Sequence, residues 1–437
     1  MTKDYDAVVV GSGLAGSIAA RELQQRGKRT VILEARDRVG GRAFTTEFGG
    51  GSIEMGGQNV YWTEPFIWSE ISRYRLPIAE VVPFQTYAVS EGGNLNRYPA
   101  AAAAKQLGAG FDAFFGDNAD IMPRPMDPTF RREALQEIDQ LSIRGRLEAI
   151  DLDHEVLRWL RPWLEMRTGG APETGAYAWL LHIWSLADWQ WQKILTVSSR
   201  YRVATGMKSL IDAIQADAGA DLELNSPVVR IDDQRDRVLV TTAGGEEYAA
   251  HGVVVATSAN MWSTIDFGGR LSPLKQQSSV DGMQTPVSFT KLWALVDGPV
   301  DNVYVQNADT NVNPIIHLRK DLERPDGLTQ VIAFSVDPTV AASRKAEIPQ
   351  FFEELLPSNG KARIVETKAL DWVAEPFSRG GTSLLRPGQL SRIDQIAASE
   401  GRVAFATADI ATAAPGFDGA IQTGIRAAYD VLRATSR

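Results

Sequence analysis

Cysteine is absent from this 437-residue chain, and histidine occurs only four times. Without cysteine the chain forms no disulfide and offers no thiolate metal ligand or cysteinyl nucleophile. The histidines are scattered without the spacing of a metal site, so no metal is predicted; they are His154, His182, His251 and His317. The lack of cysteine is compatible with the cytoplasm, which we predict as the location.

Long apolar runs and basic clusters are missing as well. No apolar run reaches the roughly 18 residues that a membrane helix needs, and Met1–Asp6 lacks the layout of a signal peptide. The net charge is -9 and no basic stripe is visible, which argues against binding to nucleic acid. With 44% hydrophobic and 23% charged residues, the composition is that of a globular protein of two or three domains.

A strand, a glycine-rich turn and a helix open the chain. Ala7–Val10 is a short apolar run typical of a buried parallel strand, 15–26 has helical periodicity, and Thr30–Leu33 predicts a second strand. The turn between the first two reads Gly11-Ser12-Gly13-Leu14-Ala15-Gly16, and Glu34 ends the second strand. This order, with an acidic residue near the expected spacing of roughly 20 residues, predicts a dinucleotide site rather than an incidental glycine turn.

The residue types fit that chemistry. Gly11 permits the tight turn, Gly13 lets the backbone approach a pyrophosphate, and Gly16 lets the helix pack closely on the strand. The N–H groups at the helix start, from Leu14 onwards, are free to bind the anion, and Glu34 can accept hydrogen bonds from a ribose. This pattern alone leaves NAD and FAD open.

Three further segments favour FAD. Glu34-Ala35-Arg36 leads to Gly40-Gly41-Arg42, Ile53–Asn59 contains Gly56-Gly57, and the chain closes on a segment around Asp409 followed by Gly419–Ala428. In this order they resemble the flavin-containing amine oxidase family, within it the 6-hydroxynicotine oxidase group. The resemblance implies noncovalent FAD, because Thr382 stands where some members carry the cysteine that links the cofactor. The implied FAD-binding residues are Gly11, Gly13, Leu14, Ala15, Gly16, Glu34, Ala35, Arg36, Gly41, Arg42, Gly56, Gly57, Gln58, Asn59, Val228, Trp372, Asp409, Phe417 and Ala420.

The resemblance also implies a two-domain α/β fold. A Rossmann-type FAD-binding domain would comprise residues 1–83, 201–262 and 396–437. A substrate-binding domain with a mixed sheet and a helical cap would comprise 84–200, expected to be mainly helical, and 263–395. The tryptophans of the helical part are expected to be mostly core; they are Trp179, Trp184, Trp189 and Trp191. The expected assembly is a homodimer.

Three residues are candidates for the reacting centre. Lys291 lies in a strand-like apolar run, where spacing alone favours an exposed lysine, but many family members hold a water near the flavin with a lysine at this position. Tyr61 and Glu64 follow the flavin-facing glycines. Glu64 is either a base or amine anchor, or a helix N-cap before Pro65.

The family's aromatic substrate cage is incomplete here. One of its positions corresponds to Ser383, and the other lies near Phe417, where the chain is one residue shorter than the family pattern. A bulky or weakly basic amine or amide is therefore expected as substrate, including amide oxidation with cyclisation in antibiotic biosynthesis, as in the lankacidin pathway.

The expected reaction moves a hydride from a carbon next to nitrogen to flavin N5, gives an iminium, and reduces O2 to peroxide. Two alternatives stay open. One is a C–C desaturase of the protoporphyrinogen oxidase type, and the other is a catalytically silent flavoprotein.

Overall fold

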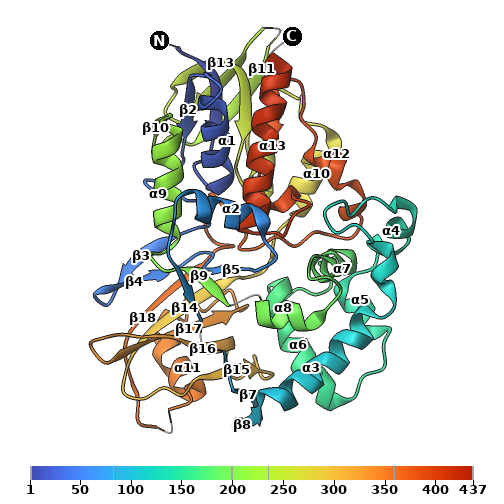
Figure 1. The fold of residues 1–437 in the computed structure, drawn as a ribbon, viewed down its shortest axis with the longest axis vertical. Coiled ribbons are helices and arrows are strands. Elements are labelled where there is room, and N and C mark those ends of the chain that lie inside the picture. The colour runs from blue at the N-terminus through green and yellow to red at the C-terminus, as the bar shows by residue number, and fades with distance from the viewer. Residues whose placement is uncertain (1, 82, 198–199, 235, 359, 436–437) are drawn as a thin grey trace.

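The computed structural model describes residues 2–81, 83–197, 200–234, 236–358 and 360–435. Two seven-stranded sheets organise the chain, one in the upper and one in the lower part of Figure 1. The upper sheet has the order β10-β2-β1-β13-β12-β11, with β19 paired to β13. Its strands are β1 (Lys3–Val10), β2 (Thr30–Leu33), β10 (Asp221–Glu223), β11 (Val228–Asp233), β12 (Val238–Thr242), β13 (Glu247–Val255) and β19 (Val403–Phe405).

In the upper sheet β12 runs antiparallel to its two neighbours, β11 and β13, and the other pairs are parallel. The sheet is covered on both faces. Alternation along β1 sends Ala7 and Val9 to one face and Val8 and Val10 to the other, all at most 3% exposed. The first face packs on α1 (Leu14–Gln24) and α13 (Phe417–Thr435), which lie side by side in Figure 1. The helix α9 (Met207–Ala218) packs against α1. The βαβ unit predicted at the N-terminus is confirmed.

The lower sheet has the order β18-β14-β17-β16-β15-β7-β8. Alternation along β14 sends Leu292, Ala294 and Val296 towards α11 (Ile348–Leu355), while Lys291 and Trp293 face the other side. Lys291 therefore lies on the face opposite α11, where it is shielded from solvent. The strands are β7 (Thr86–Glu91), β8 (Asn94–Pro99), β14 (Thr290–Asp297), β15 (Val303–Asn307), β16 (Ile315–Glu323), β17 (Leu328–Ser335) and β18 (Arg363–Asp371).

Helices fill one side of the lower half of Figure 1. Trp179 and Trp184 lie in the main hydrophobic core, and Trp189 and Trp191 pack against it, which confirms the expected core role. The helices are α3 (Ala100–Phe115), α4 (Arg132–Asp139), α5 (Ile143–Glu148), α6 (His154–Thr168), α7 (Tyr177–Leu186) and α8 (Trp191–Val197). Among the described residues, no helix combines the length and apolarity required to cross a membrane.

The prediction of a mainly helical segment from residue 84 is wrong at its start. Residues 86–99 form the hairpin β7–β8 at an edge of the lower sheet. Gly92 and Gly93, both with positive φ, make the turn. The partner of β7 is the distant strand β15, which local sequence does not reveal.

Small elements lie between the two sheets or beside the upper one. They are β3 (Thr45–Phe48), β4 (Gly51–Glu54), β5 (Asn59–Val60), β6 (Ile78–Glu80), β9 (Tyr201–Val203), α2 (Pro65–Arg73), α10 (Pro273–Asp281) and α12 (Ile393–Ala397).

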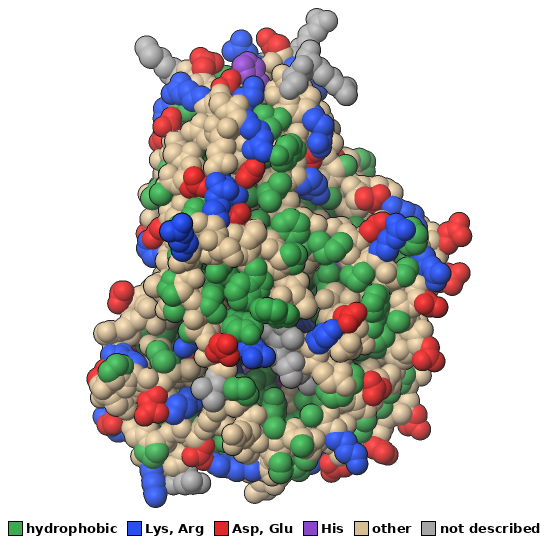
Figure 2. All heavy atoms as spheres, in the orientation of Figure 1, with side chains coloured by type: hydrophobic (Ala, Val, Ile, Leu, Met, Phe, Trp, Pro, Cys, Tyr) green, Lys and Arg blue, Asp and Glu red, His purple; other side chains and the backbone are tan. Residues whose placement is uncertain are grey.

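Figure 2 shows hydrophobic side chains gathered near the middle of the face that is turned to the viewer. Trp62 is 66% exposed, and its ring contacts those of Trp68 and Tyr201 at 5.9 and 6.1 Å.

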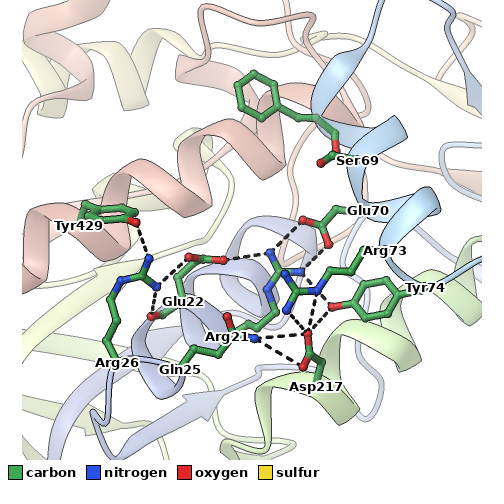
Figure 3. A network of polar contacts seen from close by, with 11 residues as sticks. Arg21, Glu22, Gln25, Arg26, Ser69, Glu70, Arg73, Tyr74, Asp217 and Tyr429 are labelled. Carbon is green, nitrogen blue, oxygen red and sulfur yellow. Dashed lines mark hydrogen bonds and ion pairs between the residues drawn. The ribbon is translucent and has the colours of Figure 1, made fainter.

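An ion network that is buried around Arg21 and exposed at its edges joins α1, α2, α9 and α13 (Figure 3). Arg21 of α1 is 2% exposed, and its Nη2 donates to Glu70 Oε1 of α2 at 2.8 Å. Its Nη1 donates to the Tyr74 hydroxyl at 2.9 Å, which donates in turn to Asp217 of α9 at 2.8 Å. The network fixes α2, and with it the loop from residue 55 to 64, against the first helix of the chain.

Candidate functional site

A cavity of about 560 Å³ runs between the two sheets. It begins at the carboxyl ends of β1 and β2, where ligands of open α/β sheets bind, and continues to the inner face of the lower sheet. The volume is within the range of small-molecule and cofactor sites. Nearly all residues predicted for the site line it: Gly11, Gly13, Leu14, Ala15, Glu34, Ala35, Arg36, Gly41, Arg42, Gly56, Gly57, Gln58, Asn59, Tyr61, Glu64, Val228, Lys291, Trp372, Phe417 and Ala420.

Gly16 and Asp409 do not line the cavity. A Cβ on Gly16 would lie 2.0 Å from the Gly11 carbonyl oxygen, so Gly16 serves the packing of α1 on the strand, as predicted. Asp409 is 2% exposed and lies behind Arg42, which donates to it at 3.1 Å. Asp409 thus contacts Arg42, while the neighbouring residues Thr407 and Ala408 line the cavity, and its role in binding the cofactor stays a prediction.

The carboxylate of Asp409 is held by several donors. The Ala259 N–H donates to it at 3.1 Å, Gln284 at 2.6 Å and the Ser383 hydroxyl at 2.9 Å. Burial alone would raise the pKa of Asp409, but Arg42 and these donors outweigh it and keep the pKa below its ordinary value. Asp409 is therefore ionised and fixes the orientation of the Arg42 guanidinium.

The start of α1 offers donors to an anion. Gly13 is the N-cap, no side chain caps the helix, and the first-turn N–H groups have no acceptor within it. Glu34 accepts from the Ser12 N–H at 2.8 Å and from its hydroxyl at 2.7 Å, which holds the carboxylate at the cavity wall. The buried Thr257 Oγ1 and Asn59 Oδ1 line the cavity without a partner in the protein. These groups fit the pyrophosphate, ribose and flavin of FAD.

Gly57 and Phe417 lie against each other at the middle of the cavity. A Cβ on Gly57 would lie 2.6 Å from the Phe417 ring, so the absent side chain makes room for this contact. Trp372 lines the same cavity and donates from Nε1 to the carbonyl of Met55, the residue before Gly56, at 2.9 Å. Ser383 occupies the first position of the expected aromatic cage, and its hydroxyl donates to Asp409. This position therefore carries no aromatic ring.

Lys291 is buried at the junction of the two halves. Its Nζ donates to the Gly56 carbonyl at 2.8 Å and to Gln58 Oε1 at 3.3 Å. Burial lowers the pKa of Lys291 to about 7, against the opposing effect of the Glu54 and Asp321 carboxylates. The exposed-strand alternative is therefore wrong, because the lysine is only 3% exposed.

Gln58 connects Lys291 to a second charged group. Its Nε2 donates to Asp321 Oδ1 at 2.9 Å, and Asp321 also accepts from Arg202 at 2.7 Å and Arg319 at 3.4 Å. The side-chain amide of Gln58 is thus bound to Lys291 and Asp321, although Gln58 also lines the cavity.

Glu64 is not the helix cap that the alternative interpretation expected. It occupies the N-cap position of α2 without a capping bond, while Asp418 of α13 accepts from the Phe66 and Ile67 N–H groups at 2.6 and 2.9 Å. Glu64 instead accepts from the Tyr61 N–H at 2.9 Å and lines the cavity. Burial, opposed by that N–H and reinforced by Asp418, raises the pKa of Glu64 to about 8.

The raised pKa of Glu64 predicts a pH-dependent stability. The ordinary value is 4.5, so the contribution of the protonated carboxyl is complete below pH 4.5 and is lost as the pH rises through about 8. Glu64→Gln keeps a neutral group at every pH. Its free energy of unfolding, relative to the unchanged protein, is expected to rise between pH 5 and pH 8 in urea titrations. A difference independent of pH would show that Glu64 is ionised throughout.

Gly13→Ala tests the cofactor end without disturbing the fold. The added Cβ would meet only Gly41 Cα, at 3.9 Å, so the apoprotein should keep its stability within about 0.5 kcal/mol. The methyl group narrows the cavity where the pyrophosphate is expected, and crowding of about 1–3 kcal/mol would weaken FAD binding roughly 5- to 150-fold. Fluorescence titration of the apoprotein with FAD measures this. Gly16→Ala, by contrast, should lose stability and FAD together.

Several cavity residues were missed from the sequence. They lie beyond Lys291, in the substrate-side half of the cavity: Phe84, Tyr87, Trp163, Arg167, Tyr304, Gln306 and His317. Their spacing in the sequence forms no known motif. Only the alternation of side chains along β15 and β16 could have indicated that Tyr304, Gln306 and His317 share one face of the sheet. Tyr61 faces Arg167 among them, and burial raises the pKa of Tyr61 above its ordinary value.

Comparisons with known proteins agree with this geometry. Residues 14–432 match the family model described as flavin containing amine oxidoreductase. The chain is 34% identical to a pseudooxynicotine dehydrogenase of Pseudomonas sp, covering 98% of this chain and 86% of that protein. It is 25% identical to (S)-6-hydroxynicotine oxidase of Paenarthrobacter nicotinovorans, covering 98% and 99%.

A solved structure of putrescine oxidase bound to putrescine has the same fold, with a TM-score of 0.84, 22% identity, and coverage of 99% of this chain and 100% of that one. The predicted amine oxidase fold and the resemblance to the 6-hydroxynicotine oxidase group are confirmed. FAD is the cofactor, and the reaction is oxidation at a C–N bond. The chain belongs to the flavin-containing amine oxidoreductase family.

Proposed function

We propose that this enzyme oxidises an amine that carries a pyridine-like ring, as nicotine-derived amines do. The names of its relatives support this substrate class. The observation that carries the reaction is the buried Lys291 at the junction between the FAD-side and substrate-side halves of the cavity. Bound FAD supplies a hydride acceptor at N5 and passes the electrons to O2, so that the amine becomes an imine and H2O2 is released.

The residues around Lys291 prepare the substrate for this step. With a pKa of about 7, the lysine exchanges a proton readily at neutral pH, and Gly56 and Gln58 fix its position. Glu64 is protonated below pH 8 and can donate a hydrogen bond into the cavity. The aromatic walls exclude water from the C–H bond that breaks.

The predicted domains remain part of this proposal. The segments 1–83, 201–262 and 396–437 would form the FAD-binding domain around the upper sheet. The segments 84–200 and 263–395 would form the substrate-binding domain around the lower one. The homodimer and the cytoplasmic location stay predictions from the sequence. The relatives named above give no support to an amide substrate or to antibiotic biosynthesis, and we do not propose them.

Anaerobic reduction of the flavin tests the function. The purified protein is mixed with pyridyl amines, simple alkyl amines and apolar polyenes, and bleaching near 450 nm is followed. Rapid bleaching by pyridyl amines is expected, followed by peroxide release on admission of air. Bleaching by polyenes alone would identify a C–C desaturase, and bleaching by none would identify a silent flavoprotein.

A further inference from the structure

The lower sheet carries a row of side chains that starts at Lys291. Lys291 of β14 pairs with Phe334 of β17, Phe334 with His317 of β16, and His317 with Gln306 of β15. Directly paired residues lie on the same face of a sheet, and adjacent strands are about 4.8 Å apart. His317 therefore lies two strands, about 10 Å, and Gln306 three strands, about 14 Å, from the lysine.

An aromatic wall stands beside this row. Tyr304 and Tyr87 occupy the neighbouring row of the same face, with ring centroids 5.4 Å apart, and Phe84 packs on Tyr304 at 5.5 Å. The Tyr304 hydroxyl is 2.8 Å from His317 Nδ1, so the imidazole is held in place. A flat aromatic group fits against this wall.

Two polar atoms of the row have no partner in the protein. His317 Nε2 and Gln306 Oε1 are buried without a hydrogen bond, and their residues are 3% and 2% exposed and line the cavity. Burial, and then the nearby Arg167 charge, lowers the pKa of His317 to about 3, so the ring is neutral. Unpaired buried polar groups are costly, and a ligand that pairs with them is favoured.

Arg167 of α6 brings a positive charge to the same place. Its guanidinium lies 5.1 Å from the centroid of the Trp163 ring, and its Nε is buried without a partner. The Tyr61 hydroxyl is within hydrogen-bonding reach of the guanidinium. Its charge acts on Tyr61, Tyr304 and His317, which places it among the side chains of the substrate-side half.

We propose that Arg167 and His317 donate to a hydrogen-bond-accepting group at the end of the substrate remote from the oxidised amine, and that the Gln306 amide joins them when it is turned to present Nε2 in place of its unpaired Oε1. The proposal rests on the amine oxidation proposed above and names the residues that select the substrate. A carbonyl oxygen, an aromatic ring nitrogen or a carboxylate would satisfy the subsite. A diamine would place its second ammonium group beside Arg167, so diamines are poor substrates.

The test compares four amines of equal chain length. Their remote ends are a pyridyl ketone, a phenyl group, a carboxylate and a second ammonium group, and kcat/KM comes from stopped-flow flavin reduction. The pyridyl ketone is expected to exceed the phenyl amine by roughly 10-fold or more, with the diamine poorest. A still better carboxylate would show that the natural acceptor is anionic.

Variants assign the preference to these residues. Arg167→Met is expected to reduce the ketone-to-phenyl ratio of kcat/KM at least roughly 5-fold. Gln306→Leu provides a second variant if Arg167→Met does not fold. Arg161→Met, an exposed arginine on the same helix, is the control and should leave the ratio unchanged.

Two results would overturn the proposal. One is equal rates for ketone and phenyl amines in the unchanged protein. The other is an equal loss for both amines in Arg167→Met and in Gln306→Leu, which would indicate a purely structural role. In either case the amines still bleach the flavin and the proposed function stands. If no amine bleaches it, the function itself fails.

Discussion

Replacing Lys291 by methionine is expected to slow flavin reduction or reoxidation by roughly 10²- to 10⁴-fold, the range of a lost proton-transfer group. The pKa of about 7 makes this lysine an efficient proton donor and acceptor at neutral pH. Methionine preserves most of the volume, so the cavity should keep its shape. Stopped-flow measurement of the two half-reactions shows which one depends on the lysine, and the inflection near pH 7 should disappear with it.

A matched control exists for this variant. Lys275 of α10 is 1% exposed and pairs with Glu400 at 3.0 Å, outside the cavity. Lys275→Met should reduce stability but leave both half-reactions unchanged. If Lys291→Met behaved in the same way, the lysine would have a structural role only.

Removing Glu70 is expected to reduce the free energy of unfolding by about 3–5 kcal/mol. Glu70→Ala leaves the buried guanidinium of Arg21 without its bidentate partner, and the remaining contacts with Glu22 and Tyr74 do not replace it. Urea unfolding followed by circular dichroism measures the loss.

The nearby exposed pair provides the comparison. Arg73 and Asp217 are 42% and 31% exposed at their side chains, and Arg73→Ala should cost only about 0–1 kcal/mol. A similar small loss for Glu70→Ala would mean that water reaches Arg21 and replaces the carboxylate.

The sequence predicted those parts of the molecule in which neighbours in the chain are neighbours in space. The glycine-rich turn, Glu34 and the segment up to Arg42 form one continuous wall of the cavity, so their spacing carried the information. The βαβ unit follows from the same local pattern. Family resemblance extended this to Lys291, whose burial could not be derived from one strand alone.

Contacts between distant segments were not predictable. The pairing of β7 with β15 joins residues about two hundred positions apart, and the substrate-side wall depends on it. Arg167 reaches that wall from a helix whose sequence shows only ordinary amphipathic spacing. The sequence left the role of Glu64 open, because the carboxylate that accepts from the first N–H groups of α2 is that of Asp418, in the last helix of the chain.

The bond between Asp418 and the start of α2 makes the two halves of the cavity depend on each other. Phe417, the preceding residue, rests on Gly57 beside the expected flavin position, while Asp418 holds the helix that follows Glu64. Two adjacent residues of the last helix therefore link the cofactor half of the cavity to the loop that faces the substrate. A change at either residue should therefore disturb FAD binding and the substrate-facing loop together.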